Sequence, residues 1–383
     1  MTALAMDLSS AGLPPSALPD DATVLAQVAI IADGPLRNAA REIDEGHYPL
    51  EIMTALGGTG ALGAHLRHNG GRLGLAIAAM QTASRACGST GFLMWAHDVC
   101  GLYLEGSDNP ALSSSLLETH SAGLTFGGTA LSNPVKAVAG IEDFLLRARR
   151  VPGGYIVTGA LPWVSHIASG QYFGGMAGVP KADGGFSHAI LFFMRCDDRI
   201  ALRPCPRFSG MEGTSTWSVR FDEVFVPDAE VIADPAQLLL GRIREAFILL
   251  QTGMAMGIIE GSINDMRDVE GQLGHVNRFL SDRPDELTGE LAELRTRIMR
   301  LAETPEDGST DYMVDVLDAR CQASDLCLRA SQSALLHQGA RGYLHAAAPQ
   351  RRVREAHFAA IVTPAIKHLR WEMARLLRDE VPA

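Results

Sequence analysis

The feature of this sequence that most constrains its fold is the spacing of its apolar residues, which changes period twice along the chain. From about residue 21 to 119, apolar residues recur at i, i+3, i+4 and i+7, which is typical of amphipathic helices. From about 124 to 231 the apolar runs are short, often alternating, and separated by Gly, Pro and Asp, which is typical of strands. From about 234 onward the helical spacing returns in long segments. The pattern predicts an α+β protein with helices before and after a small β domain.

The strand-like zone can be divided further. It contains the runs "DFLLRARRV", "GGYIVTGALPWV", "YFGGMAGV", "HAILFFMRC", "ALRPCP" and "TWSVRFDEVFVP", each of which we expect to be a strand. We place the domain boundaries at 1–122, 123–232 and 233–383. The long helices expected after 233, interrupted by a loop at 303–311, need partners for their apolar stripes, so we expect a helical bundle or a subunit interface there.

Composition excludes several classes of protein. The formal net charge of −11 argues against a nucleic-acid-binding surface, which needs clustered Lys and Arg. No run approaches the 18–20 uninterrupted apolar residues of a membrane span, and residues 1–21 lack the basic and apolar regions of a secretory signal. The six cysteines show neither C-x-x-C nor zinc-ligand spacing, so we expect reduced thiols, no metal site and a cytoplasmic protein.

The run 153–165 carries the first functional signal. Trp163 and Ser165 are two residues apart on an expected strand, so their side chains should lie on the same face. An aromatic plate beside a hydroxyl suits a flat ring with polar edges, such as a flavin. The alternative is that Trp163 is simply a half-buried strand residue.

Three segments in order resemble the acyl-CoA dehydrogenase superfamily. In 130–170, Ser132-Asn133-Pro134 stands where the family has Thr-Glu-Pro, and Gly159 followed by Trp163-Val164-Ser165 matches its G-x-x-x-W-[IV]-[TS] strand. The segment 208–232 is similar to the family's G-M-x-x-[ST] signature with its following V-x-F-x-x-V-x-V-P strand. The segment 337–369 is similar to its C-terminal Gly-rich turn and R-[DE]-A helix.

The resemblance implies a fold and a cofactor. The fold would be an N-terminal helical domain, a middle β-barrel-like domain and a C-terminal four-helix bundle, and the cofactor FAD, with FMN as the alternative. Trp163, Val164 and Ser165 would line the flavin ring, with Ser165 near N5, and Leu131 and Ser132 would contact its pyrimidine side. In this family a second group reaches the FAD of a neighbouring subunit, which implies a homodimer or homotetramer; here it would comprise Arg278, Phe279, Gly339, Ala340 and Gly342.

The chain departs from the family where the chemistry is carried. The carboxylate that usually takes the α-proton of the substrate is replaced by Thr363, which cannot act as a base near neutral pH. A second location used by some members has Glu245 two residues off register, so Glu245 is either the base or an exposed i,i+3 partner of Arg242. The CoA-holding G-A-G-S-D stretch is replaced by "VKAVA", and Glu212 stands where many members have Arg, which puts CoA binding in doubt.

Three functions remain open. The flavin-facing strand favours a dehydrogenase-like, two-electron oxidation of an acyl-CoA or related small substrate, with an electron-transfer flavoprotein as partner. The missing carboxylate favours a two-component monooxygenase that receives reduced flavin from a reductase and uses O₂, with His97, His166 or His357 as hydrogen-bond donor or acid. A member that keeps the fold as a binding or structural protein is the third.

Overall fold

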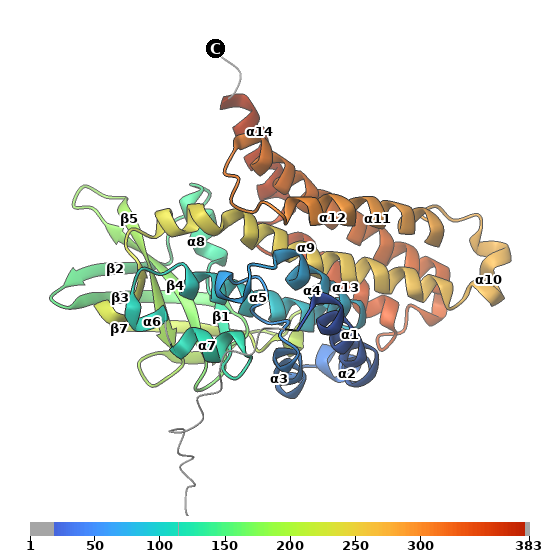
Figure 1. Ribbon diagram of the computed structural model, residues 1–383, viewed down its shortest axis with the longest axis horizontal. Coiled ribbons are helices and arrows are strands. Elements are labelled where there is room, and N and C mark those ends of the chain that lie inside the picture. Colours follow the sequence, from blue (N-terminus) through green and yellow to red (C-terminus); the bar gives the residue numbers. More distant parts are fainter. Residues whose placement is uncertain (1–18, 114, 380–383) are drawn as a thin grey trace, which may run out of the picture.

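The computed structural model describes residues 19–113 and 115–379. The N-terminal helices are α1 (Asp21–Ile31), α2 (Arg37–Asp44), α3 (Leu50–Gly58), α4 (Leu73–Ala86), α5 (Gly88–Glu105), α6 (Pro110–Ser113) and α7 (Ser115–Ser121). Figure 1 shows α1 and α4 beside the C-terminal helices, and α6 and α7 near the strands, which lie at one end of the molecule. Helix α1 begins at Asp20, whose carboxylate accepts a hydrogen bond from the Thr23 N–H at 2.9 Å.

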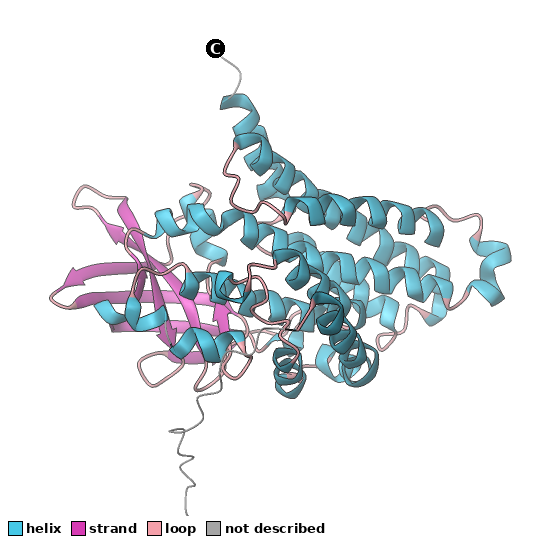
Figure 2. Cartoon of the chain, in the orientation of Figure 1, coloured by secondary structure: helices cyan, strands magenta, loops and turns pink. Residues whose placement is uncertain are grey.

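The middle zone is an eight-stranded sheet, drawn in magenta in Figure 2. Its strands are β1 (Gly127–Thr129), β2 (Leu146–Val151), β3 (Gly154–Val164), β4 (Tyr172–Pro180), β5 (Phe186–Arg195), β6 (Ala201–Pro204), β7 (Trp217–Pro227) and β8 (Val231–Ala233). The order is β6-β7-β3-β2-β4-β5-β8, and β1 lies parallel to β4. All six predicted runs form strands. The sheet runs from β6 to β8, and no pairing joins these two strands within the described residues, so the barrel-like expectation becomes an open sheet.

The C-terminal zone is helical, as predicted. It contains α9 (Ala236–Arg267), α10 (Glu270–Asn277), α11 (Pro284–Leu301), α12 (Thr310–Gln338), α13 (Ala348–Ile361) and α14 (Ile366–Asp379). Helix α9 is central, because α4, α5, α11, α12 and α13 all pack against it. The N-terminal and C-terminal helices therefore share one hydrophobic core, while much of the sheet's apolar surface forms a second core of its own.

Three glycines let α9 approach α4 closely. Gly253, Gly257 and Gly261 lie four residues apart, so they form one ridge along the helix. A Cβ added to Gly257 would lie 2.3 Å from the carbonyl oxygen of Gln81, and the other two meet α4 carbonyl oxygens at 2.7 and 2.6 Å. The two helix backbones therefore pack in contact, which no larger side chain at these positions would allow.

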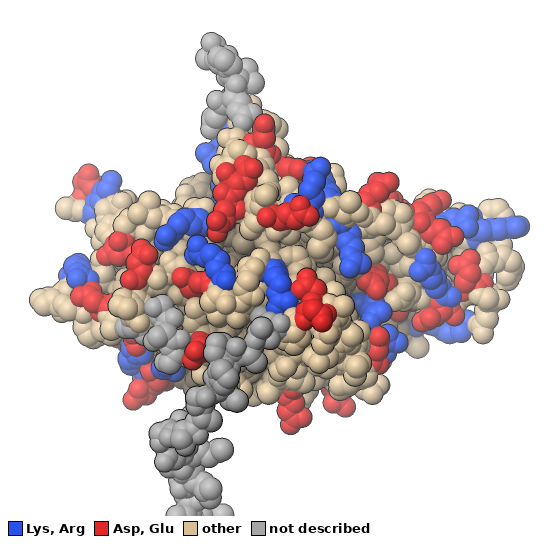
Figure 3. Space-filling model, viewed as in Figure 1, with Lys and Arg blue, Asp and Glu red and all other residues tan. Residues whose placement is uncertain are grey.

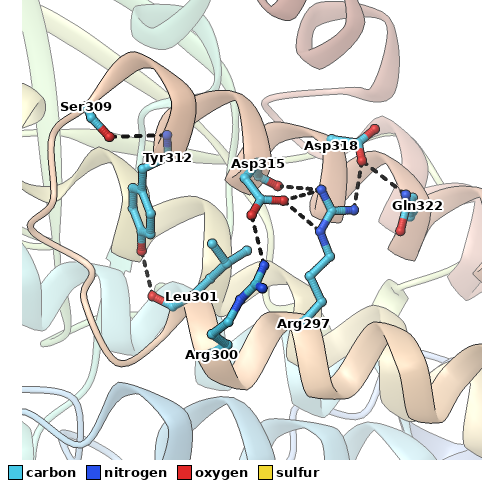
Figure 4. A network of polar contacts seen from close by, with 8 residues as sticks. All are labelled: Arg297, Arg300, Leu301, Ser309, Tyr312, Asp315, Asp318 and Gln322. Atoms are coloured by element: carbon cyan, nitrogen blue, oxygen red, sulfur yellow. Dashed lines mark hydrogen bonds and ion pairs between the residues drawn. The ribbon is translucent and has the colours of Figure 1, made fainter.

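An ion-pair network joins α11 to α12, as Figure 4 shows. Arg297 pairs with Asp315, and its Nη1 donates to Asp318 Oδ2 at 2.7 Å. Arg300 adds a 3.2 Å contact to Asp315, and the loop between the helices is held where Tyr312 OH donates to the Leu301 carbonyl at 2.6 Å. These contacts fix the register of the two helices.

Three observations bear on the class of protein. Among the described helices, only α9 is long and apolar enough to cross a membrane, but 89% of its most apolar window is buried, as expected of a core helix. On the face drawn in Figure 3, basic and acidic side chains are interspersed rather than gathered by sign. All six cysteines are free thiols.

Candidate active site

Trp163 and Ser165 lie where the ends of three strands meet. Val164 is fully buried in the sheet's own core, whereas 55% of the Trp163 side chain is exposed, so the alternation predicted for this strand holds. Ser165 forms a bridge with Thr129 at the end of β1, and its hydroxyl lies 2.7 Å from Thr216 Oγ1 before β7. An exposed indole next to a fixed pair of hydroxyls forms an uncovered plate with a polar edge. Val164 can contribute only its backbone.

A second polar pair comes from segments far apart in the sequence. Ser132, at the start of α8 (Ser132–Val138), has its hydroxyl 3.2 Å from that of Thr363, which follows α13. Leu131 is buried beside Ser132. The structure thus brings together the residue expected at the pyrimidine side of a flavin and the residue expected, from the resemblance, at the position of the family's usual base.

Buried polar residues anchor the backbone of the loop that contains Thr363. Gln251 donates its Nε2–H to the Thr363 carbonyl at 2.8 Å, and Arg320 donates from Nε to Gln251 Oε1 at 2.9 Å. Arg320 is fully buried and also donates to the Ala359 carbonyl at 2.5 Å and to Ser324. Burial lowers the pKa of Arg320 to about 10. Because its neighbours are neutral acceptors rather than carboxylates, this guanidinium fixes helix α12 to α9 and α13 by geometry.

Asn133 takes a structural role where the family has Glu. Its amide donates to Glu142 Oε1 at 2.8 Å and to the Asp143 carbonyl at 2.9 Å, and its carbonyl accepts the Leu145 N–H at 2.9 Å. Asn133 therefore closes the turn between α8 and β2.

A cavity of about 270 Å³ opens beside the Ser132–Thr363 pair, because Leu131 and Pro364 are part of its wall. Most of the wall is apolar. It comprises Leu131, Val135, Val138, Ala139, Gln237, Leu240, Gly241, Ile243, Arg244, Phe247, Ile248, Leu317, Pro364, His368, Leu369, Glu372 and Arg375. The "VKAVA" stretch forms most of α8 and supplies three of these side chains, so the altered segment is a wall of the cavity.

The carboxylate in the cavity wall is engaged by two arginines. Glu372 Oε1 lies 2.9 Å from Arg244 Nη2 and 2.6 Å from Arg375 Nη2. Burial raises the pKa of Glu372, but the hydrogen bonds from Arg375 and Arg244 outweigh burial and bring the pKa below its usual value. Glu372 is therefore an ionised structural carboxylate and a weak base.

Glu245 is not part of this wall, although Arg244 before it and Phe247 after it are. Its side chain is buried, and burial raises its pKa. The expectation of an exposed partner for Arg242 is wrong, because Arg242 instead donates to the Gly106 carbonyl at 3.3 Å. Burial, and after it the charge of Glu245, raises the pKa of Tyr312, so Glu245 lies near Tyr312 rather than in the cavity wall.

His97 lies in the core rather than in the cavity wall. Its ring stacks on His120 with centroids 3.7 Å apart, and each ring contacts the other's backbone carbonyl at 2.9 Å. Burial lowers the pKa of His97 to about 3. His166 is also buried, with Nδ1 3.0 Å from Tyr48 OH, and His357 is exposed and contacts its own helix backbone. Of these candidate donors, His97 and His166 belong to a buried cluster behind the end of the strand that holds Ser165. His357 lies on the surface.

The second predicted group lies at the other end of the molecule, around α10 in Figure 1. Arg278 stacks on Phe279, with its guanidinium carbon 4.9 Å from the ring centroid, and Phe279 is 77% exposed. The turn that holds Gly339, Ala340 and Gly342 follows α12, and Arg341 in it donates to Gln272 in α10 at 3.1 Å. Within one chain this group does not meet Trp163.

The sequence interpretation missed the residues that support the site. Arg320, Gln251 and His368 lie on helical stripes that resemble any other in this chain. Buried polar residues in long helices are a weak signal, since only the tertiary structure shows which of them face a site.

A flavin fits the first group of residues by chemistry. Among the described residues more than half of the Trp163 side chain is left exposed, and an exposed indole is the surface that an isoalloxazine ring requires. The Ser165 and Thr216 hydroxyls supply polar contacts at one edge, and Ser132 and Thr363 supply a second pair. No cluster of three or more metal-ligating side chains occurs in the described ranges.

Comparison with known proteins identifies the fold of this chain. No family model matches the sequence. The chain is 24% identical over 370 residues to the probable acyl-CoA dehydrogenase FadE25 of Mycobacterium tuberculosis, which covers 91% of this chain and 92% of that protein. It superposes on butyryl-CoA dehydrogenase from Megasphaera elsdenii with a TM-score of 0.80 at 17% identity, covering 97% of this chain and 100% of that chain. It superposes on dibenzothiophene monooxygenase (TdsC) from Paenibacillus sp. A11-2 with a TM-score of 0.79 at 17% identity, covering 94% and 98%. The chain therefore has the acyl-CoA dehydrogenase fold, and over most of its length its sequence is similar to that of a probable acyl-CoA dehydrogenase.

Proposed function

We propose that this protein is a flavin-dependent oxidoreductase that carries out a dehydrogenase-like, two-electron oxidation of a small substrate held in the cavity beside Thr363. The observation that supports this most strongly is the uncovered Trp163 plate with its fixed hydroxyl edge, Ser165–Thr216. We propose FAD as the cofactor, with FMN as the alternative. The bound flavin would supply the two-electron acceptor.

The chain's own residues have separate tasks in this proposal. Trp163 packs on the ring, and Ser165 donates to its edge. Gln251 and Arg320 hold the Thr363 loop, so the cavity keeps its shape while substrate exchanges. The apolar wall excludes water from the reacting atoms.

The remaining assignments follow the resemblance. We propose division at 1–122, 123–232 and 233–383, a cytoplasmic homodimer or homotetramer, and an electron-transfer flavoprotein as redox partner. The names of FadE25 and butyryl-CoA dehydrogenase suggest an acyl-CoA substrate. Against a CoA carrier, a second hollow that shares Val138 and Gln237 with the cavity is lined by Glu142 and Asp143, which disfavour a polyanion.

A specific observation supports the monooxygenase alternative. The carboxylate in the cavity wall, Glu372, is held by two arginines, and Thr363 has no acid–base function near neutral pH. A reaction that needs a dry pocket and no carboxylate base is compatible with this site. Dibenzothiophene monooxygenase, which has the same fold, has been solved with FMN and indole.

The test is an anaerobic absorbance titration of the purified protein with FAD and FMN, then with an acyl-CoA panel, followed by O₂ and a flavin reductase. Bleaching of bound flavin by an acyl-CoA supports the dehydrogenase. Consumption of O₂ with reduced flavin, without bleaching by any acyl-CoA, supports the monooxygenase. Protein that binds neither oxidised nor reduced flavin is a binding or structural protein, and the proposal is then wrong.

Trp163→Ala should weaken flavin binding at least about tenfold, because an aromatic stacking contact contributes ~1 kcal/mol or more beyond its buried area. The measurement is the flavin dissociation constant by fluorescence quenching. Phe225→Ala is the matched control, because Phe225 is an exposed aromatic residue on β7 of the same sheet, 44% accessible, and pairs with Ile156 near the opposite end of β3 from Trp163. Equal flavin affinity in the two variants would contradict the role of Trp163.

A further inference from the structure

His368 has a distinct position in the cavity wall. It lies in the first turn of α14, only 9% of it is exposed, and its Nδ1 is buried without a hydrogen-bond partner among the described residues. The other ionisable side chains of the wall, Arg244, Glu372 and Arg375, bind one another. His368 is therefore the ionisable group of the wall that is left to meet a ligand.

The surroundings of the ring keep it neutral. Burial lowers the pKa of His368, Glu372 on the same helix raises it, and Arg244 from α9 and Lys136 from α8 lower it further, with a net decrease. The Trp371 ring lies beside it, with centroids 5.8 Å apart. Near pH 7 the imidazole therefore carries one proton, on either Nδ1 or Nε2.

The buried nitrogen decides which tautomer is favoured. A proton on Nδ1 would be a buried donor without an acceptor, and such orphaned donors are rarer in proteins than acceptors that lack a donor. The proton therefore belongs on Nε2. Because Nδ1 is sealed in the protein, the ring edge that contains Nε2 is the one left to face the cavity.

The cavity also limits the size and polarity of its ligand. Its volume of about 270 Å³ lies at the low end of small-molecule sites, which span roughly 300–1,000 Å³. Its wall is mainly Leu, Ile, Val and Phe, so a compact apolar body fits and a long chain does not.

We propose that His368 donates a hydrogen bond from Nε2 to an oxygen of the substrate, and so selects compact apolar molecules that carry a carbonyl or a similar acceptor oxygen. This inference rests on the proposed function, because it takes the cavity as the substrate site. His368 is then a specificity residue on a helix that the superfamily resemblance did not implicate.

The test uses two probes of similar shape, acetophenone and ethylbenzene, which differ in the acceptor oxygen. Binding to the full-length protein, with and without FAD, is measured by ligand-observed NMR. The wild type should bind acetophenone about five- to tenfold more tightly, as expected for one hydrogen bond of ~1 kcal/mol. His368→Leu should lose this preference while it keeps its affinity for ethylbenzene within about twofold, and His368→Gln, which retains a donor, should keep part of it. His47→Leu is the control, because His47 is exposed and outside the cavity wall.

Several outcomes would overturn the proposal. They are a preference for acetophenone that survives in His368→Leu, equal binding of both probes by the wild type, and binding of neither probe by the wild type. A readout without ligand covers a variant that fails to fold: ¹⁵N spectra of the wild-type histidines at pH 7.5 should show His368 protonated on Nε2, and protonation on Nδ1 would also overturn it.

The proposed function can fail separately. If acetophenone is preferred through His368 but no flavin binds, the oxidoreductase proposal is wrong and the assignment of His368 as donor stands. If flavin binds and is reduced but His368→Leu changes nothing, only the assignment of His368 is wrong.

Discussion

Thr363 connects two parts of the site in different ways. Its hydroxyl meets Ser132, and its backbone carbonyl accepts from Gln251, which is in turn held by Arg320. The backbone contact belongs to the buried hydrogen bonds of Gln251 and Arg320, which join three helices. The hydroxyl contact with Ser132 is instead exposed, beside the cavity. The main contribution of this residue is therefore the position of its backbone.

Thr363→Ala should change turnover by less than about threefold, because the variant keeps the backbone carbonyl and a threonine hydroxyl cannot act as a base near neutral pH. The measurement is kcat/KM with whichever substrate reduces the flavin in the panel. A loss of two or more orders of magnitude would show that the hydroxyl takes part in proton transfer. Gln251→Leu, which removes the support of the loop, should be the more damaging change.

Residues on the flavin-facing strand could be predicted from the sequence, and the residues of the cavity could not. The period of two between Trp163 and Ser165 fixes their common face once the strand is recognised. His368 and Arg320 instead depend on how α12 and α14 rotate against α9, which neither spacing nor composition specifies. The burial of Glu245 could not be predicted for the same reason.

At the level of elements, the glycine ridge on α9 fixes its contact with α4. Gly257→Ala should lower the free energy of unfolding by about 1–3 kcal/mol, because the new Cβ would overlap the backbone of α4. Gly289→Ala on α11 is the matched control: an added Cβ there meets nothing within 4 Å, so it should stabilise by about 0.5–1 kcal/mol through helix propensity. Urea unfolding of both variants checks this, and equal effects would contradict the close approach of α4 and α9.

The elements that the sequence did not predict are the shortest ones. Strands β1 and β8 have three residues each, and α8 has seven, so none is long enough to show a period. Their positions follow from the sheet: β1 is held parallel to β4, and β8 pairs with β5. Helix α8 nevertheless forms a wall of the cavity, so the elements hardest to predict are close to the site.

At the scale of the whole molecule, four buried histidines lie where the N-terminal helices meet the sheet. Burial lowers the pKa of His65 to about 4 and of His97 to about 3, and it also lowers the pKa values of His120 and His166. Below pH ~6.5 these histidines bind protons in the unfolded chain but stay neutral in the folded chain. The free energy of unfolding therefore falls as pH falls, by about 1.4 kcal/mol per pH unit for each histidine. Buried Asp98, whose pKa burial raises, acts in the opposite direction.

The melting temperature should therefore drop between pH 7.5 and 5.5. His166→Asn should show a shallower drop, because it removes one of these groups and because Asn tolerates the left-handed backbone found at this position, with φ of 60°. Differential scanning calorimetry of both proteins across this range is the measurement. A melting temperature that stays constant or rises toward pH 5.5 would contradict the assignment.

The contact between α4 and the glycine ridge of α9 also bears on the order in which the chain folds as it is made. Helix α4 ends at Ala86, but the ridge it packs against extends to Gly261. At ~5–20 residues per second, the ribosome needs roughly 10–35 s to add the intervening chain. Throughout that interval the N-terminal helices lack the surface that completes their core, so their native packing must wait until about two-thirds of the chain has been made.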